Sequence, residues 1–147
     1  MILEAQGKRV VFAPGCFDLF HIGHLNFIEA AAALGDFLVL GVGTSEHIRA
    51  LAADKGDEII PFDQRRQIVA ALKCVDATIP YEPYYGGDFS VFDKYDVAIW
   101  AVGPEHGRYE FQDDVDEELE RRGVQLVTIP RTPNISTTII KKRIREP

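Results

Sequence analysis

Two histidines stand three residues apart in a mostly apolar stretch of the sequence. His21 and His24 lie in "GCFDLFHIGHL" (15–25), where aliphatic residues would pack better. If a helix begins near Ile22, both imidazoles lie on one side of its first turn, beside backbone N–H groups without helical partners. Such a turn binds anions, and imidazole N–H donors match phosphate oxygens. The spacing favours a phosphate site; the alternative is one capping histidine and one core histidine.

Cationic side chains that could assist such a site follow later in the chain. Lys55 in "ADKGDE" is a candidate mobile cation for phosphates or an incoming substrate; the alternative is a solvated loop lysine. Arg65 in "PFDQRR" is a candidate phosphate clamp, because a guanidinium can donate two parallel hydrogen bonds. Arg66 is expected to face solvent. Asp18 either helps to hold a nucleotide or its metal ion, or caps the loop locally.

A second candidate phosphate cradle lies near the C-terminal end of the sequence. Ser136, Thr137 and Thr138 are expected to open a final helix, and Arg131 precedes them. A helix N-cap alone would explain Ser136, but not three adjacent hydroxyls and an arginine. Two common nucleotide signatures are absent: there is no G-x-x-x-x-G-K-[ST] loop, and "GVGTSE" (41–46) lacks the third glycine of a dinucleotide fingerprint.

Alternating strands and helices are predicted to position these residues. Five apolar, β-branched runs without alternation predict strands buried on both faces of a parallel sheet; they are 9–13, 37–43, 77–81, 97–102 and 124–129. Helical patterns follow at 22–34, 63–73, 113–122 and from about Ser136 onward. The pattern predicts an α/β fold, a Rossmann-like doubly wound parallel five-stranded sheet in a single domain (1–147). Ligands of such sheets bind beyond the carboxyl ends of the strands, where the loop after the first strand lies.

Composition narrows the class of protein. The chain has 147 residues and a formal net charge of −7, which disfavours a nucleic-acid partner. No apolar run approaches the roughly 20 residues of a membrane helix, and no secretory signal is visible. Cys16 and Cys74 form neither a zinc spacing nor a disulfide framework. We therefore expect a cytoplasmic protein that binds neither nucleic acid nor membranes.

The histidine stretch resembles the H-x-G-H signature of the cytidylyltransferase-like nucleotidyltransferases. These include glycerol-3-phosphate, phosphocholine and phosphoethanolamine cytidylyltransferases. Further matches keep the family's order: "LGDFLVLGVGTSE" (34–46) resembles its second strand, and Lys55–Gly56 with Arg65 falls at the spacing of its K-G…E-R element. "RTPNISTTIIKKRI" (131–144) is similar to its R-T-x-G-I-S-T-T closing motif. The resemblance covers most of the chain.

The resemblance implies roles for individual residues. His21, His24, Lys55 and Arg65 would be catalytic, with the histidines donating to the triphosphate and to the transition state. Asp18 would be the candidate metal ligand. The implied nucleotide-binding positions are Gly15, Cys16, Phe17, Asp18, His21, His24, Gly103, Arg131, Ile135, Ser136, Thr137 and Thr138.

The resemblance also implies a reaction. A small phosphorylated alcohol or polyol, such as glycerol 3-phosphate, would attack the α-phosphate of CTP and release pyrophosphate, with Mg²⁺ on the triphosphate. A homodimer is implied as well. Two alternatives stay open: an adenylyltransferase that uses ATP, and a nucleotide-binding regulatory module without catalysis.

Three segments depart from the family pattern or stay open. "VGPEHGRYEF" (102–111) keeps Gly103 but not the G-D-D-W-like residues expected near the base and acceptor, so the choice of donor and acceptor is open. Asn134 replaces the usual glycine of the closing motif, and asparagine tolerates positive φ. "PYEPYYGGDF" (80–89) is either a lid or a structural loop with aromatic plugs.

Overall fold

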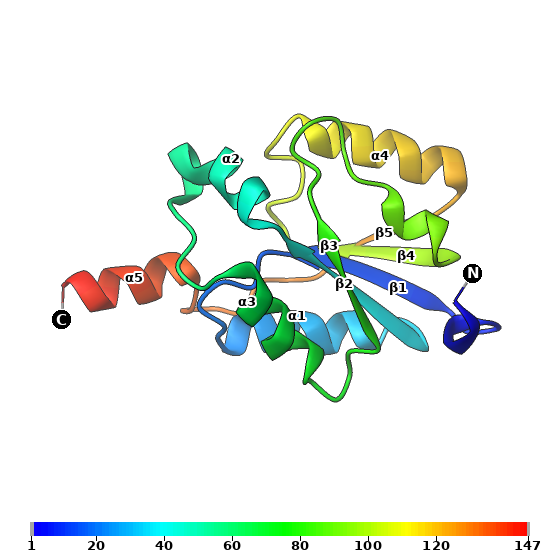
Figure 1. The fold of residues 1–147 in the computed structure, drawn as a ribbon, viewed down its shortest axis with the longest axis horizontal. Helices are drawn as coiled ribbons and strands as arrows, with labels where there is room; N and C mark the ends of the chain where they lie inside the picture. Colours follow the sequence, from blue (N-terminus) through cyan, green and yellow to red (C-terminus); the bar gives the residue numbers. More distant parts are fainter. Residues whose placement is uncertain (1, 147) are drawn as a thin grey trace.

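A computed structural model describes residues 2–146 as one parallel sheet with helices on both faces (Figure 1). The strands are β1 (Val10–Gly15), β2 (Phe37–Gly43), β3 (Ala77–Tyr81), β4 (Val97–Val102) and β5 (Gln125–Thr128). The α-helices are α1 (Ile22–Ala32), α2 (Ser45–Lys55), α3 (Phe62–Ala70), α4 (Phe111–Arg122) and α5 (Thr137–Arg145). Two short 3-10 helices are η1 (Leu3–Ala5) and η2 (Ser90–Asp93). The predicted five-stranded, doubly wound α/β fold is confirmed.

The strand order is β3-β2-β1-β4-β5, and every pairing is parallel. Side chains of β1 alternate between two cores, as the two-residue repeat of a strand requires. Val11 packs on the face that α1 and α3 cover, whereas Phe12 packs with Trp100 on the face that α4 covers. From β1 the strand order runs outward through β2 to β3, and it then continues on the other side of β1 with β4 and β5. In this class of fold, ligands bind at this switch point between β1 and β4.

The expected burial is wrong for the two edge strands. β5 is mostly exposed, and Pro80 of β3 is exposed too, because an edge strand has a neighbour on one side only. β1 also runs two residues further than predicted, through Pro14 and Gly15.

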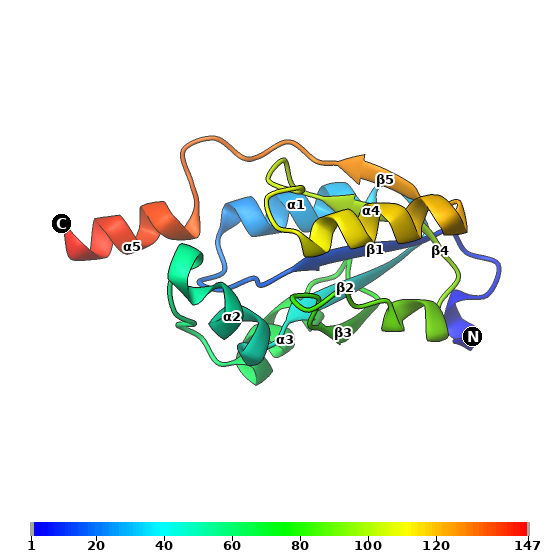
Figure 2. The same cartoon turned by 90° about the horizontal axis from the view of Figure 1, so that it is seen from above.

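Helix α2 was not among the predicted helices. Its apolar stripe is short, with Ile48 and Leu51 buried, while its last turn carries the charged residues of "ADK", which resemble a loop. It places Lys55 at a helix end rather than in the middle of a loop. The last helix begins as predicted, with Ser136 as its N-cap. In two perpendicular views, α5 extends away from the rest of the fold (Figures 1 and 2).

Candidate active site

A cavity of about 710 Å³ opens at the carboxyl ends of the strands. It is lined by the last residues of β1, β3 and β4 and by the first turns of α1 and α5. The predicted site residues that line it are Gly15, Cys16, Phe17, Asp18, His21, His24, Lys55, Gly103, Arg131, Ile135, Ser136, Thr137 and Thr138. The structure therefore brings together all predicted site residues except Arg65.

The loop after β1 reaches the cavity through an unusual backbone path. Phe17 and Leu19 both have positive φ, 56° and 49°, a region that is uncommon for residues other than glycine. The ring of Phe17 folds back over Gly15, where a Cβ would lie 2.8 Å from it. Strain of this kind persists only where the surrounding structure holds it, and it gathers at functional loops.

The two histidines cap the helix that they open. His21 is the N-cap of α1: its Nδ1 accepts a hydrogen bond from the Gly23 amide at 3.0 Å. His24 completes the capping box, since its Nδ1 accepts from the backbone N–H of His21 at 3.2 Å. The rings stack with their centroids 3.8 Å apart. His21 and His24 therefore both cap α1 and both line the cavity.

This geometry determines which ring nitrogen can donate. A backbone N–H can only donate, so both Nδ1 atoms are acceptors and carry no proton. Burial lowers the pKa of His21, and burial together with His21 lowers that of His24 to about 4. Both rings are therefore neutral near pH 7, and in neutral imidazole the proton then sits on Nε2. Each histidine has an Nε2–H donor that is not needed for the cap.

We expect acid to destabilise the protein through two cavity histidines. Burial lowers the pKa of His24 and of His47 from 6.5 to about 4. Between these pH values the unfolded chain binds more protons than the folded one, so the free energy of unfolding falls as pH drops from 6.5 toward 4. Urea denaturation at several pH values measures this. The His47→Phe variant should show a smaller fall than wild type; an equal fall would contradict the expectation.

The closing motif forms the wall of the cavity next to the histidine loop. The Ser136 hydroxyl accepts from the Ile139 amide at 3.1 Å, and the Thr137 hydroxyl donates to the Asp18 carbonyl at 3.2 Å. The second contact ties α5 to the histidine loop across 119 residues. Ile135 packs against Gly23, with its Cγ2 3.4 Å from the place of a Cβ there. Two helix N-termini thus converge on one cavity, an arrangement suited to anions.

Asn134 has φ 63°, the left-handed conformation that glycine adopts most readily and that asparagine tolerates better than most residues. We expect Asn134→Gly to leave stability close to wild type and Asn134→Ala to lower the free energy of unfolding by roughly 1 kcal/mol. Chemical denaturation of the two variants measures the difference. Equal stability of the alanine and glycine variants would show that the turn does not depend on this conformation.

Lys55 is held at the rim by the segment that follows β4. Its Nζ lies 5.7 Å from the ring centroid of Tyr109. Asp54, next to it, accepts hydrogen bonds from the Tyr109 hydroxyl and, at 2.9 Å, from Arg108. Nearby, Glu105 pairs with Arg131 at 3.3 Å. The segment 102–111, which departs from the family pattern, thus connects the end of α2 with the closing motif.

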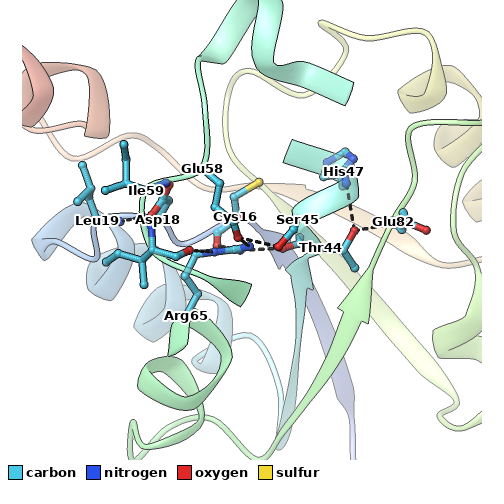
Figure 3. Close-up of polar contacts among 12 residues, drawn as sticks. Cys16, Asp18, Leu19, Thr44, Ser45, His47, Glu58, Ile59, Arg65 and Glu82 are labelled. Atoms are coloured by element: carbon cyan, nitrogen blue, oxygen red, sulfur yellow. Dashed lines mark hydrogen bonds and ion pairs between the residues drawn. The ribbon is translucent and has the colours of Figure 1, made fainter. Parts of the chain in front are cut away.

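Arg65 does not lie where a phosphate clamp was expected. It is 1% exposed, does not line the cavity, and donates to the carbonyls of Cys16 and Gly43 at 2.7 Å each (Figure 3). It also donates to the Ile60 carbonyl at 2.8 Å and pairs with Glu58 at 2.6 Å. The assignment of Arg65 as a phosphate clamp is corrected: its donors are occupied by the ends of β1 and β2. Arg66 also differs from expectation, since it is half-buried and bonded to Thr78.

Asp18 has the position of a local cap rather than that of a metal ligand. Its carboxylate, 8% exposed, accepts three backbone amides, those of Leu19, Ile59 and Ile60, at 3.0, 2.8 and 2.9 Å (Figure 3). Within residues 2–146, no group of three His, Cys, Asp or Glu side chains is arranged to hold a metal ion. A metal in this cavity would depend on oxygens that a ligand brings, as Mg²⁺ commonly does with phosphates.

Other cavity residues were not predicted. They include His47, Leu51, Asp54, Tyr81, Trp100, His106, Arg108, Tyr109, Phe111 and Lys141. His47 lies on α2, a helix that was not predicted. Arg108 pairs with Asp54, which is 54 residues earlier in the sequence, so local spacing could not indicate this contact. In the loop 80–89, Tyr81 lines the cavity, whereas Tyr84 and Tyr85 do not. Burial raises the pKa of the Cys16 thiol, so this group stays protonated near pH 7.

Comparisons with known proteins identify the family of this chain. The family model described as "Cytidylyltransferase-like" matches residues 12–143. "Bifunctional protein HldE" of Alcanivorax borkumensis is 35% identical over 144 residues, 97% of this chain but 29% of that protein. The HldE of Geobacter sulfurreducens is 44% identical over 79 residues, 54% of this chain and 16% of that protein. The chain thus spans less than a third of these relatives.

Solved structures share the fold. The "lipopolysaccharide core biosynthesis protein" of Thermoplasma volcanium superposes with a TM-score of 0.65 at 22% identity, over 86% of this chain and 98% of that one. None of the helices in residues 2–146 has the length and apolar character of a membrane span. The histidine pair, the closing motif and the family match over most of the chain lead to one conclusion: this chain belongs to the cytidylyltransferase-like family.

Proposed function

We propose that this domain transfers a nucleoside monophosphate from a nucleoside triphosphate to the phosphate group of a small phosphorylated polyol. An oxygen of the acceptor phosphate attacks the α-phosphorus, a new P–O bond forms, and the bond to the bridging oxygen breaks so that pyrophosphate leaves. The observation that carries the proposal is the pair of Nε2–H donors of His21 and His24, held by backbone hydrogen bonds at the mouth of the sheet.

The acceptor needs no general base from the protein. A phosphate monoester has its second pKa near 6 and is largely a dianion at neutral pH. Catalysis then depends on positioning two anions and stabilising the charge of the transition state. This positioning and charge stabilisation would come from three sources: the neutral N–H donors of His21 and His24, the hydroxyls of the closing motif and the ammonium group of Lys55. Mg²⁺ would enter with the triphosphate and neutralise its oxygens.

Two nucleoside triphosphates, CTP and ATP, are candidates for the nucleotide substrate. The resemblance to cytidylyltransferases favours CTP, with an acceptor such as glycerol 3-phosphate. The HldE relative of Alcanivorax borkumensis, which aligns along 97% of the chain, favours ATP and a sugar phosphate. We rank ATP first, because a relative aligned over the whole domain is more specific than a family that spans several nucleotides. CTP remains the second candidate.

A pyrophosphate-release assay tests the proposal. ATP and CTP, each with Mg²⁺, are combined with a panel of sugar phosphates, polyol phosphates and aminoalkyl phosphates. Acceptor-dependent release with one nucleotide is the expected result. Nucleotide binding without turnover on every acceptor would support the inactive regulatory module instead. Sedimentation of the same sample tests the predicted homodimer.

A further inference from the structure

The cavity has an aromatic compartment that the phosphate chemistry does not use. We give this name to His47, Leu51, Tyr81, Trp100 and Phe111, all of which line the cavity. The His47 ring meets Tyr81 and Phe111 edge-on, with centroids 6.4 and 5.7 Å away. Tyr81 in turn meets Trp100 edge-on at 6.1 Å. The compartment presents apolar ring surfaces around a single imidazole.

The imidazole of His47 has hydrogen-bonding capacity that nothing in the described chain uses. The residue is 6% exposed, and its Nδ1 is buried without a partner. In contrast to the ring, the backbone N–H of His47 is bonded: it donates to the hydroxyl of Thr44, the N-cap of α2 (Figure 3). A neutral imidazole offers one donor and one acceptor, and buried polar groups are normally paired. A ligand in the cavity can supply the missing partner, once a rotation about χ2 turns the ring nitrogen toward it.

The compartment lies on the face of the sheet that α4 covers, since Tyr81 and Trp100 pack in that core and Phe111 begins α4, whereas the histidine pair opens α1 on the other face. His47 follows β2 and Tyr81 ends β3, whereas Trp100 lies on β4, and Gly103 and Arg131 follow β4 and β5. β1, which carries the histidine loop, lies between these two pairs of strands. In-line transfer needs the acceptor and the leaving group on opposite sides of the α-phosphorus. The aromatic compartment on the α4 face is therefore a candidate surface for the acceptor, and the closing motif beside the histidine loop is left for the leaving group.

We propose that the aromatic compartment binds the carbon skeleton of the acceptor and that His47 selects a hydroxylated one by hydrogen-bonding one of its hydroxyls. This rests on the proposed nucleotidyl transfer. The rings of Tyr81 and Phe111 offer flat apolar faces to the C–H side of a sugar or polyol. A cationic acceptor fits less well, because the ammonium group of Lys55 lines the same cavity. A quaternary ammonium also brings no donor for the imidazole.

Kinetics of two His47 variants with the preferred acceptor test this. His47→Phe keeps the flat ring but removes both nitrogens, whereas His47→Asn restores a polar group near Nδ1. We expect His47→Phe to raise KM for the hydroxylated acceptor roughly tenfold, the value of one buried hydrogen bond. The KM for the nucleotide should stay within about twofold of wild type, and His47→Asn should recover part of the loss.

Deoxy analogues of the acceptor make the test specific. The analogue that lacks the selected hydroxyl should bind wild type more weakly, by the same factor, but bind His47→Phe as well as the parent compound does. Equal acceptor KM for wild type and His47→Phe, a rise in the nucleotide KM instead, or a preference for aminoalkyl phosphates would each overturn the proposal. Calorimetric binding of the acceptor gives the same comparison without turnover, so failure of the transfer reaction is recognised separately.

Discussion

The His24→Ala variant is expected to lose about a hundredfold to a thousandfold in kcat while keeping its fold, the loss typical of one preorganised donor to a transition state. Steady-state pyrophosphate release with saturating substrates measures it. KM for the nucleotide should change less than kcat, since the donor acts mainly on charge that develops in the transition state. Turnover near wild type would remove His24 from the mechanism.

Alanine removes two things at once, because the ring of His24 both caps and donates. Its Nδ1 accepts from the His21 amide, whereas Nε2–H is the donor assigned to substrate. His24→Asn separates the two functions: the amide oxygen of asparagine can take the place of Nδ1, but no donor reaches the place of Nε2. We expect this variant to be as slow as His24→Ala but more stable.

His106 provides a matched control in the same cavity. Its Nε2 lies 2.7 Å from the Asp116 carboxylate, so that nitrogen is not offered to a phosphate. We expect His106→Ala to change kcat by less than about tenfold, well under the loss of a transition-state donor. A loss equal to that of His24→Ala would mean that any imidazole in the cavity supports the reaction.

Residues whose conformation depends on their neighbours in the sequence were predictable. Ser136 caps a helix that begins at the next residue, as its residue type predicts. His21 and His24 were expected on the first turn of a helix that begins near Ile22, and they lie there. Asn134 was expected to adopt a positive φ for a local reason as well, and it does. The parallel sheet followed from continuous apolar runs, which reflect burial on two faces.

Residues that depend on distant partners were not predictable. An arginine in "PFDQRR" looks the same whether it meets a phosphate or a buried carbonyl. Only the folded chain brings the carbonyls of Cys16 and Gly43, 49 and 22 residues away, to Arg65. His47 was missed for a related reason. No sequence motif singles it out; it stands out only because its buried Nδ1 has no hydrogen-bond partner in the folded structure.

The Arg65→Met variant tests the corrected role of this residue as a positioning residue. We expect it to lower the free energy of unfolding by about 3–5 kcal/mol, the range for removing one partner of a buried ion pair. Glu58 would lose its cation, and the carbonyls of Cys16, Gly43 and Ile60 would lose their donors. Urea denaturation with an unchanged m-value measures this as a shift in midpoint.

Two further variants keep this prediction testable if Arg65→Met does not fold. Arg65→Lys retains the charge but not the planar fork that reaches two strand ends at once, so an intermediate loss of stability is expected. Arg66→Ala, a neighbour on the same helix with bonds to Thr78 only, should cost about 1 kcal/mol. If Arg65→Lys or Arg65→Met matched wild type in stability but lost turnover, the guanidinium would have to contact substrate. Three carbonyl contacts and one carboxylate contact hold the guanidinium of Arg65 behind the cavity wall. We therefore expect stability to change most. Activity should change only to the extent that the loss of the contact with Cys16 displaces the histidine loop.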